Sequence, residues 1–299
     1  MIKRILGRTR LEVTQLGFGA MELRGPKTWS GREVSEDQAA ILLHAVLDSG
    51  INFIDTSPDY GLSEERIGRH IASRRGEYFI ATKCGCNPRD MGDHIETMPH
   101  DWTSANLLRN IEGSLRRMAT DHVDVLQLHN ATVDEVAAHG VVDTLLKIKS
   151  RGLTRFLGVS TTYPHLEAFL DMGVFDTFQI PYSCLEPLHH DAIAQVGNAG
   201  AGVIVRGGIA QGAPGGQWEA TRRAELWQRA RLDELARGMS AQEMILRFTL
   251  SHPHCHTCIV GTGSVEHLQQ NLAAAAKGPL SPDAYEEILF RVEEAMTTA

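Results

Sequence analysis

The sequence predicts an α/β fold, a (β/α)8 TIM barrel with an N-terminal β-hairpin and extra C-terminal helices. Short apolar runs with strand character alternate along the chain with segments of helical periodicity. The alternation repeats at roughly 30-residue intervals, which is the length of one strand–helix unit. Eight strands can be counted, the number at which parallel strands joined by helices close into a barrel.

The predicted strands are apolar runs bounded by turn residues. They cover residues 15–18, 52–55, 78–82, 123–128, 155–159, 177–180, 202–205 and 256–260. Two β-prone stretches before them, residues 2–6 and 11–14, predict a hairpin that caps the bottom of the barrel.

The segments between the strands place apolar residues at helical spacing. They predict helices over residues 36–49, 63–73, 104–118, 133–150, 164–171, 241–251 and 265–276, the first of them capped by Ser35. The glycine-rich residues 207–216 predict a long loop after the seventh strand. Residues 218–238 predict a solvated helix, and residues 282–296 predict an amphipathic helix packed outside the barrel.

Length, composition and net charge limit the classes of function that this chain can have. The chain has 299 residues, 42% of them hydrophobic, and no linker or low-complexity stretch, so we expect one domain over residues 1–299 and, by default, a monomer. A formal net charge of −8 disfavours nucleic-acid binding. No apolar stretch approaches the roughly 18 residues that span a bilayer, so we expect a cytoplasmic protein without membrane contact. The five cysteines are an odd number, and we expect free thiols in a reducing compartment.

The active site of such a barrel forms at the C-terminal ends of its strands. Four polar residues stand there. Asp55 ends the second strand, Tyr60 follows in its loop, Lys83 ends the third strand, and His129 ends the fourth. Each has structural explanations when taken alone, but together they can form an acid that protonates a carbonyl oxygen.

The chemistry rests on the pKa of a phenol. Free tyrosine, with a pKa near 10, donates a proton poorly at neutral pH, and a nearby ammonium lowers that pKa. Lys83 can supply the ammonium and Asp55 can pair with it, so that the lysine stays protonated. His129 can orient the substrate oxygen, while the hydride comes from a cofactor.

The motifs around these residues resemble the aldo-keto reductase family. The run FIDTSPDYGLSEERIG at residues 53–68 resembles the family signature, and ATK at residues 81–83 resembles its lysine strand end. SL and TDHVD, at residues 114–115 and 120–124, lead to His129 as the family motif does. The resemblance extends from Gly17 to Asn271. It implies NAD(P)-dependent hydride transfer to or from an aldehyde, ketone or sugar-like substrate, with the roles given above and no metal. The alternative is a cofactor-binding sensor or partner subunit of the same fold with little turnover.

The resemblance also implies a cofactor cradle across the barrel top. Ser160 and Gln179 hold the nicotinamide carboxamide, and Tyr182 stacks on the ring. Thr161 stands where the family often has Asn. Gly207, Gly208, Ile209 and Ala210 wrap the pyrophosphate with their backbone amides. The cradle is completed by three residues that follow the first strand, Gly19, Ala20 and Met21.

Residues 259–271 resemble the family's adenosine-binding turn and helix. Thr262 and Ser264 lie near the adenosine phosphate and Asn271 near the adenine. Gly261 and His267 stand where many NADP-preferring relatives place Lys or Arg. NADP (NADPH) is favoured on the resemblance, and NAD stays possible, with His267 making a pH-dependent phosphate contact.

Two cysteine-containing segments have rival interpretations. Residues 252–258 combine imidazoles with thiols and can suggest a metal site, but we favour a strand entrance at the barrel bottom. Cys84 and Cys86 follow Lys83, and we favour packing or substrate contact over redox control. The substrate pocket is expected to be open. Its candidate residues are Met21, Glu22, Cys86, Trp102 and Asn130, of which Trp102 can equally be a packing residue.

Overall fold

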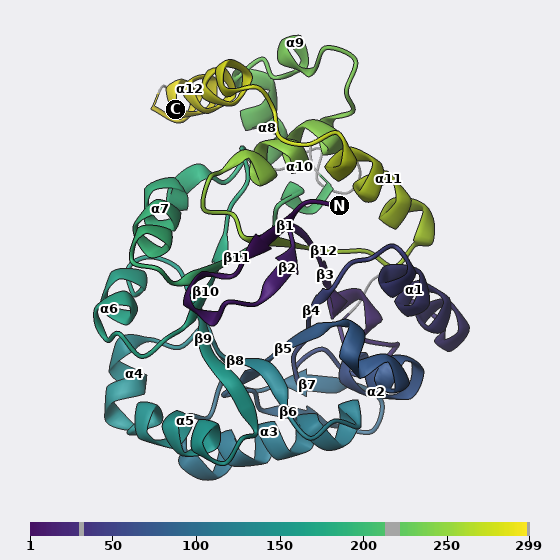
Figure 1. Ribbon diagram of the computed structural model, residues 1–299, viewed down its shortest axis with the longest axis vertical. Coiled ribbons are helices and arrows are strands. Elements are labelled where there is room, and N and C mark those ends of the chain that lie inside the picture. The colour runs from purple at the N-terminus through teal and green to yellow at the C-terminus, as the bar shows by residue number, and fades with distance from the viewer. Residues whose placement is uncertain (30–32, 213–221, 298–299) are drawn as a thin grey trace.

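The computed structural model describes residues 1–29, 33–212 and 222–297, and its centre is a closed barrel of eight parallel strands (Figure 1). Strand β12 pairs with β3, which closes the barrel. The predicted barrel is confirmed, with each strand within two residues of its predicted bounds. The strands are β3 (Leu16–Gly19), β4 (Phe53–Asp55), β5 (Phe79–Cys84), β8 (Val123–His129), β9 (Thr154–Ser160), β10 (Thr177–Pro181), β11 (Gly202–Arg206) and β12 (Thr257–Gly261).

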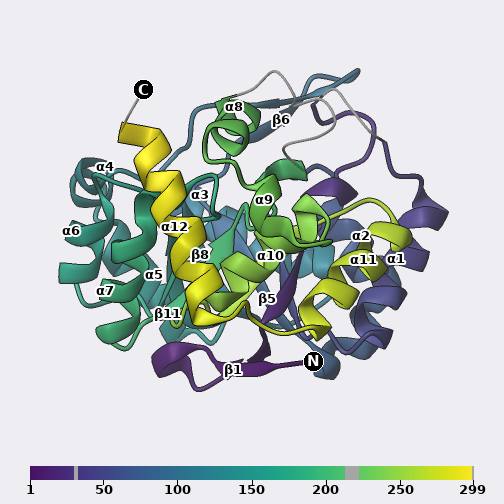
Figure 2. The ribbon, with the colours of Figure 1, turned by 90° about the horizontal axis from the view of Figure 1, so that it is seen from above.

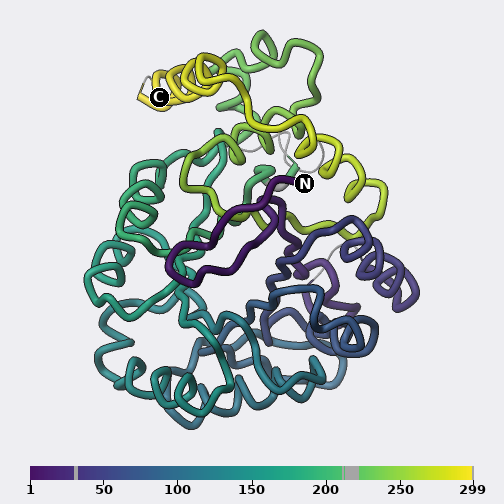
Figure 3. The backbone as a smooth tube through the Cα atoms, in the orientation of Figure 1, coloured from purple at the N-terminus to yellow at the C-terminus, as the bar shows by residue number. Residues whose placement is uncertain are grey.

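The predicted hairpin closes one end of the barrel. Strand β1 (Lys3–Ile5) pairs antiparallel with β2 (Glu12–Thr14), and the hairpin lies across the barrel opening (Figures 1 and 3). Leu6, Leu11 and Val13 are buried and pack against side chains from the barrel strands, among them Phe53 and Ile204. This end is therefore sealed by apolar contacts, and the site must lie at the other end.

Helices surround the barrel (Figure 1). Helix α1 begins after a capping box in which Ser35 and Gln38 satisfy each other's backbone N–H groups. The helices that match their predictions are α1 (Glu36–Asp48), α2 (Ser63–Ile71), α3 (Ser104–Met118), α6 (Leu166–Asp171), α10 (Ala241–Ser251), α11 (Val265–Ala276) and α12 (Pro282–Thr297). Helix α12 runs along the outside of the molecule, as Figure 2 shows.

Three expectations are wrong in detail. The helix predicted over 133–150 is two helices, α4 (Val133–Ala138) and α5 (Val141–Ser150), because Gly140 adopts a left-handed conformation with φ of 57°. The helix predicted over 218–238 is, in its described part, α8 (Arg222–Arg229) and α9 (Asp233–Ala236). The loop predicted over 207–216 contains a short 3-10 turn at Ala210–Gly212, and residues 213–221 lie outside the described chain.

An α-helix and a β-hairpin are present that were not predicted. Helix α7 (His190–Asn198) follows β10, and a two-stranded hairpin, β6 (Pro88–Asp90) with β7 (Ile95–Thr97), lies between β5 and α3. The β6–β7 hairpin lies at the end of the molecule opposite β1 (Figure 2). It is tied to an earlier loop, since Lys27 donates to the Gly92 carbonyl at 2.5 Å.

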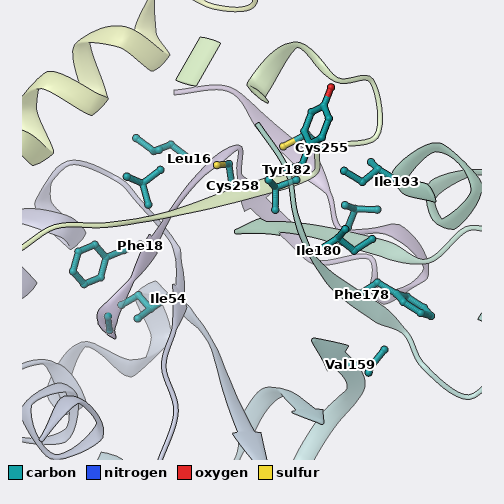
Figure 4. Close-up of a cluster of buried hydrophobic side chains, with 14 of the residues drawn as sticks. Leu16, Phe18, Ile54, Val159, Phe178, Ile180, Tyr182, Ile193, Cys255 and Cys258 are labelled. Carbon is teal, nitrogen blue, oxygen red and sulfur yellow. The ribbon is translucent and has the colours of Figure 1, made fainter. Parts of the chain in front are cut away.

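Apolar side chains fill the space between strands and helices (Figure 4). All five cysteines are buried and free, as expected. Within the described part of the chain, no helix is long and apolar enough to cross a bilayer.

Candidate active site

The candidate catalytic residues meet at the open end of the barrel because their strands are neighbours. Strand β4 pairs with β5, and β5 pairs with β8. All run in the same direction, so their C-terminal residues Asp55, Lys83 and His129 come to one rim. The structure therefore brings the predicted group together.

Lys83 and Asp55 form a buried ion pair. Lys83 Nζ lies 2.5 Å from Asp55 Oδ1 and also donates to the Thr56 carbonyl at 2.8 Å. Both side chains are at most 2% exposed. Burial opposes the charge on Lys83, but the Asp55 carboxylate outweighs it and raises the pKa of the ammonium. Lys83 is therefore a permanent cation here.

The second oxygen of Asp55 is held by two amides. Gln127 and Gln179 each donate an amide N–H to Asp55 Oδ2 at 2.8 Å. The Asp55 carboxylate thus accepts from three donors. The two amides hold the carboxylate in place, and the carboxylate in turn holds Lys83. Gln179, expected to hold a carboxamide, uses its amide nitrogen in this network, and its cofactor contact stays a prediction.

Tyr60 lies directly beside the ammonium, with Lys83 Nζ 4.9 Å from the centre of its ring. Its loop turns at Gly61, whose φ is +50° and whose absent Cβ would lie 2.2 Å from the Arg24 carbonyl oxygen. Only glycine fits there. Burial raises the pKa of Tyr60, and Lys83 only partly offsets it. Lys83 acts on this pKa in the expected direction, but the net pKa of Tyr60 is raised rather than lowered, because desolvation of the phenolate is the larger effect.

His129 is surrounded by groups that sequence reasoning missed. Its Nδ1 lies 3.0 Å from Asp59 Oδ2 and 3.3 Å from Cys86 Sγ. His100 Nε2 lies 3.4 Å from the same Asp59 oxygen. Burial opposes ionisation of Asp59, but hydrogen bonds from the two histidines hold its pKa well below the ordinary value. Burial also lowers the pKa of His129, so the ring is neutral at pH 7.

Cys86 is buried and in a poor position for redox chemistry. Burial and the nearby Asp59 carboxylate raise the pKa of its thiol, so the reactive thiolate is disfavoured. Burial likewise raises the pKa of Cys84. These two thiols fit packing or contact roles better than redox control.

An exposed tryptophan borders the tyrosine. The Trp29 ring packs edge-on against Tyr60 with 6.1 Å between ring centres, and the residue is 45% exposed. The ring of His129 also lies edge-on to Tyr60, again with 6.1 Å between ring centres. Trp29 was not predicted from the sequence, because it belongs to a loop with no periodic pattern.

The predicted carboxamide residues gather at the ends of β9 and β10. Ser160 Oγ lies 3.5 Å from Asn130 Oδ1, and the Thr161 amide donates to the Gln179 carbonyl at 3.1 Å. Next to them, at the end of β11, Arg206 has a buried Nε with no hydrogen-bond partner among the described residues. A buried donor without an acceptor is costly, so this residue marks a place where a polar ligand fits.

Tyr182 lies elsewhere. Its ring is fully buried among Phe248, His252 and His190, and its hydroxyl contacts Tyr285 at 2.8 Å. Figure 4 draws it in the apolar cluster with Cys255. The structure does not bring Tyr182 together with Tyr60, so its stacking on a nicotinamide ring stays a prediction.

The predicted adenosine segment forms a strand end and a helix N-terminus. Ser264 caps α11 by accepting from the His267 amide, and Thr262 Oγ1 accepts from the Ser264 amide at 3.1 Å. Gly261 pairs with Gly19 on β3, so this part of the rim carries no side chains. His267 is exposed in the first turn and Asn271 lies one turn further on. The arrangement suits an anion at the helix N-terminus.

Of the other substrate-pocket candidates, two have structural partners. Glu22 pairs with Arg24 at 3.0 Å. Trp102 is 3% exposed and packs against Gly85, where a Cβ would lie 2.2 Å from its ring. Met21 and Asn130 are exposed, while Ala20 is buried. The environment of Trp102 is therefore that of a packing residue, which was the alternative to a place in the substrate pocket.

The rival metal segment, residues 252–258, is engaged in backbone hydrogen bonds. His252 Nδ1 accepts from the His254 amide at 3.1 Å and its Nε2 faces the His190 carbonyl at 3.2 Å. His256 Nδ1 accepts from the Val203 amide at 2.9 Å. Both imidazoles bind backbone groups close to the start of β12, which fits the strand entrance that we favoured from the sequence.

Comparisons with known proteins agree with this geometry. The model of the aldo/keto reductase family matches residues 15–289. L-galactose dehydrogenase from Arabidopsis thaliana is 28% identical, over 92% of this chain and 88% of its own length. D-threo-aldose 1-dehydrogenase from a Pseudomonas species is 27% identical, over 89% and 90%. The holo structure of an aldo-keto reductase from Bacillus halodurans is 28% identical, covers 97% of this chain and 96% of that chain, and superposes with a TM-score of 0.86.

Proposed function

This chain belongs to the aldo/keto reductase family of oxidoreductases, and from that premise we propose that it transfers a hydride between NADP(H) and the carbonyl carbon of an aldehyde, ketone or sugar-like substrate. Tyr60 is the general acid and base. The observation that carries the proposal is the contact between Tyr60 and Lys83, a proton donor beside a fixed cation at the open end of the barrel.

The residues of the rim fit a nicotinamide dinucleotide. The unpartnered Nε of Arg206 and the side chains of Ser160 and Gln179 offer polar groups at one side. The N-terminus of α11, with Thr262 and Ser264, offers a place for a phosphate at the other. Gly207, with φ of +71°, allows the backbone to turn between them. When bound, the nicotinamide supplies or accepts the hydride.

The protein's own residues move the proton. The ring of His129 lies edge-on to Tyr60, so it can orient the substrate oxygen near the Tyr60 hydroxyl. In the direction of reduction, the Tyr60 O–H bond breaks and a new O–H bond forms on that oxygen. The phenolate left behind is stabilised by the Lys83 ammonium, and Asp55 keeps that ammonium in place. A proton from water then restores the phenol.

For the substrate class we propose a hydroxylated aldehyde or the hemiacetal of an aldose. The support is twofold. Two relatives that match about nine-tenths of this chain are named for sugar oxidation. The exposed Trp29 beside Tyr60 also offers the flat apolar face on which the C–H side of a sugar ring packs.

The test is a titration of the full-length protein with NADPH and with NADH, followed by protein fluorescence, and then turnover of a reactive aldehyde and of aldoses. We expect NADPH to bind and Tyr60→Phe to lower turnover by about 10²- to 10⁴-fold with cofactor affinity unchanged. Tyr78→Phe, which alters a buried tyrosine just before the start of β5, at the end of that strand opposite to Lys83, is the matched control. Binding of neither cofactor, or full turnover in Tyr60→Phe, contradicts the proposal. Preference for NADH overturns its cofactor part, and binding without turnover favours a sensor.

A further inference from the structure

Asp59 accepts hydrogen bonds from two histidines at the open end of the barrel. Its Oδ2 lies 3.0 Å from His129 Nδ1 and 3.4 Å from His100 Nε2. Burial opposes ionisation of Asp59, which is 2% exposed, but the two imidazoles hold the pKa of its carboxyl well below the usual range. Asp59 is therefore ionised, and an ionised carboxylate can only accept hydrogen bonds. Both ring nitrogens that face it must carry a proton.

The side chains of this group are held in place by their neighbours. The Asp59 amide donates to Ser57 Oγ at 3.2 Å, which turns the residue within its own loop. The ring of His100 packs against that of His129 with 5.1 Å between centres, and against Trp102 with 5.5 Å. The two imidazoles thus reach the carboxylate from packed positions, so the contacts with Asp59 fix the state of each ring as well as its place.

The carboxylate determines which nitrogen of His129 carries the proton. Burial lowers the pKa of His129, so the ring is neutral and has a single N–H. The contact with Asp59 places that hydrogen on Nδ1, and Nε2 is left with a lone pair. Nε2 has no hydrogen-bond partner in the described part of the chain, and the side chain is 13% exposed. Because the two nitrogens point to opposite sides of the ring, this acceptor is directed away from Asp59.

Cys86 offers His129 the opposite tautomer. Its Sγ lies 3.3 Å from His129 Nδ1, where a thiol that donates would leave the ring proton on Nε2. A thiol is a weak donor, however, whereas the bond to Asp59 is assisted by charge. The sulfur also lies 3.3 Å from Ser57 Oγ, so the thiol proton has another acceptor. Asp59 therefore sets the tautomer while it is present, and Cys86 sets it once the carboxylate is removed.

We propose that Asp59 is a positioning residue that makes His129 Nε2 the acceptor for a substrate hydroxyl next to the reacting carbon. The inference rests on the proposed function, in which the reacting oxygen lies beside Tyr60. A lone pair cannot donate to a carbonyl oxygen, but it accepts from the O–H group of a neighbouring carbon and leaves the carbonyl oxygen to Tyr60. The site therefore selects an α-hydroxy aldehyde or an aldose over an aldehyde that leaves Nε2 without a donor.

The kinetic test compares glyceraldehyde with propanal, which lacks the hydroxyls, using the full-length protein and NADPH. We expect the wild type to prefer glyceraldehyde in kcat/KM and Asp59→Leu to reduce that preference by about tenfold, the effect of one hydrogen bond. A purely structural defect lowers kcat/KM for both aldehydes alike. Asp121→Leu, which removes the carboxylate beside His122 just before the start of β8, should keep the preference. An unchanged preference in Asp59→Leu overturns the proposal.

A spectroscopic measurement tests the tautomer without turnover. The nitrogen-15 chemical shift distinguishes a protonated ring nitrogen from a bare one, and the His129 signals are assigned by their loss in His129→Gln. At about pH 8, above the usual histidine pKa, we expect the proton on Nδ1 in the wild type and on Nε2 in Asp59→Leu. A proton on Nε2 in the wild type overturns the inference, even if the variant does not fold. The expected tautomer without turnover of either aldehyde counts against the proposed function, and not against the contact between Asp59 and His129.

Discussion

Lys83 Nζ lies 4.9 Å from the centre of the Tyr60 ring. The lysine cannot move away from the ring, because its ammonium is also held by Asp55 and by the Thr56 carbonyl. A negative charge that forms on Tyr60 therefore meets a cation already in place, with no side chain to reorganise. Burial has two effects on Tyr60. It raises the pKa of the phenol, and it also strengthens the attraction between the Lys83 ammonium and any negative charge that forms on the phenol oxygen.

Removal of the carboxylate from the buried pair will destabilise the protein. Asp55→Asn leaves the Lys83 charge buried without its partner, and we expect the free energy of unfolding to fall by about 3–5 kcal/mol, measured by urea denaturation. Turnover falls as well. Asp48→Asn, which breaks the exposed pair with Arg74, is the control and should cost at most about 1 kcal/mol. A loss of similar size in both variants contradicts the role given to Asp55.

A buried histidine, His252, and a partly buried one, His256, predict a loss of stability in acid. Burial lowers the pKa of His252 and of His256 from 6.5 to about 4. Both rings accept a backbone N–H at Nδ1, which protonation prevents. The unfolded chain binds more protons between these values, so stability falls as pH drops from about 6.5 to about 4, by up to about 3 kcal/mol per histidine.

The measurement is urea unfolding at several pH values in that window. His256→Asn can still accept the Val203 N–H through its amide oxygen but does not titrate, so the dependence on pH should become shallower. His44→Asn, at an exposed position of α1, leaves the dependence as in the wild type. An unchanged slope in His256→Asn shows that this histidine is not responsible.

Cofactor preference should respond to charge at the first turn of α11. His267 is exposed there, and its imidazole cannot form the paired hydrogen bonds that a guanidinium makes with a 2′-phosphate. We expect His267→Arg to raise the affinity for NADPH by about tenfold while leaving that for NADH unchanged, since a guanidinium pairs with phosphate. Fluorescence titration measures both constants. His139→Arg adds the same charge at an exposed position directly after α4, on the other side of the barrel from α11 (Figure 1), and an equal gain there indicates a general field effect.

Trp29 should affect substrate binding more than the chemical step. Its ring borders Tyr60 from an exposed loop. We expect Trp29→Ala to raise KM for a sugar-like substrate several-fold, with kcat changed less than twofold, because a stacking surface is lost while Tyr60 and Lys83 stay in place. Trp29→Phe retains an aromatic face and should recover most of the loss. A fall in kcat alone argues that Trp29 positions Tyr60 instead.

The barrel could be predicted because each strand is a buried apolar run whose ends are marked by turn residues. The β6–β7 hairpin could not, since Arg89, Asp90, Glu96 and Thr97 are exposed and leave no alternating pattern. The division of the 133–150 segment depends on the backbone of Gly140, and a glycine within a helical pattern does not reveal its φ.

The candidate catalytic residues were accessible to sequence reasoning because strand ends of a parallel barrel meet at one rim. The contacts of Asp59 with His129 and of Trp29 with Tyr60 depend on how loops fold back over that rim. Tyr182 shows what a motif does not predict. It follows a strand in a recognisable motif, but its side chain turns into the layer between barrel and helices. Position in a motif does not determine the direction of a side chain.

The apolar seal made by Leu6, Leu11 and Val13 belongs to the same buried cluster as Phe53 and Ile204 of the barrel strands. The interior of such a barrel is packed with side chains rather than hollow. Substitutions in the β1–β2 hairpin should therefore change the stability of the barrel while the chemistry at the opposite rim stays as it is. The two ends of the same strands thus carry separate tasks.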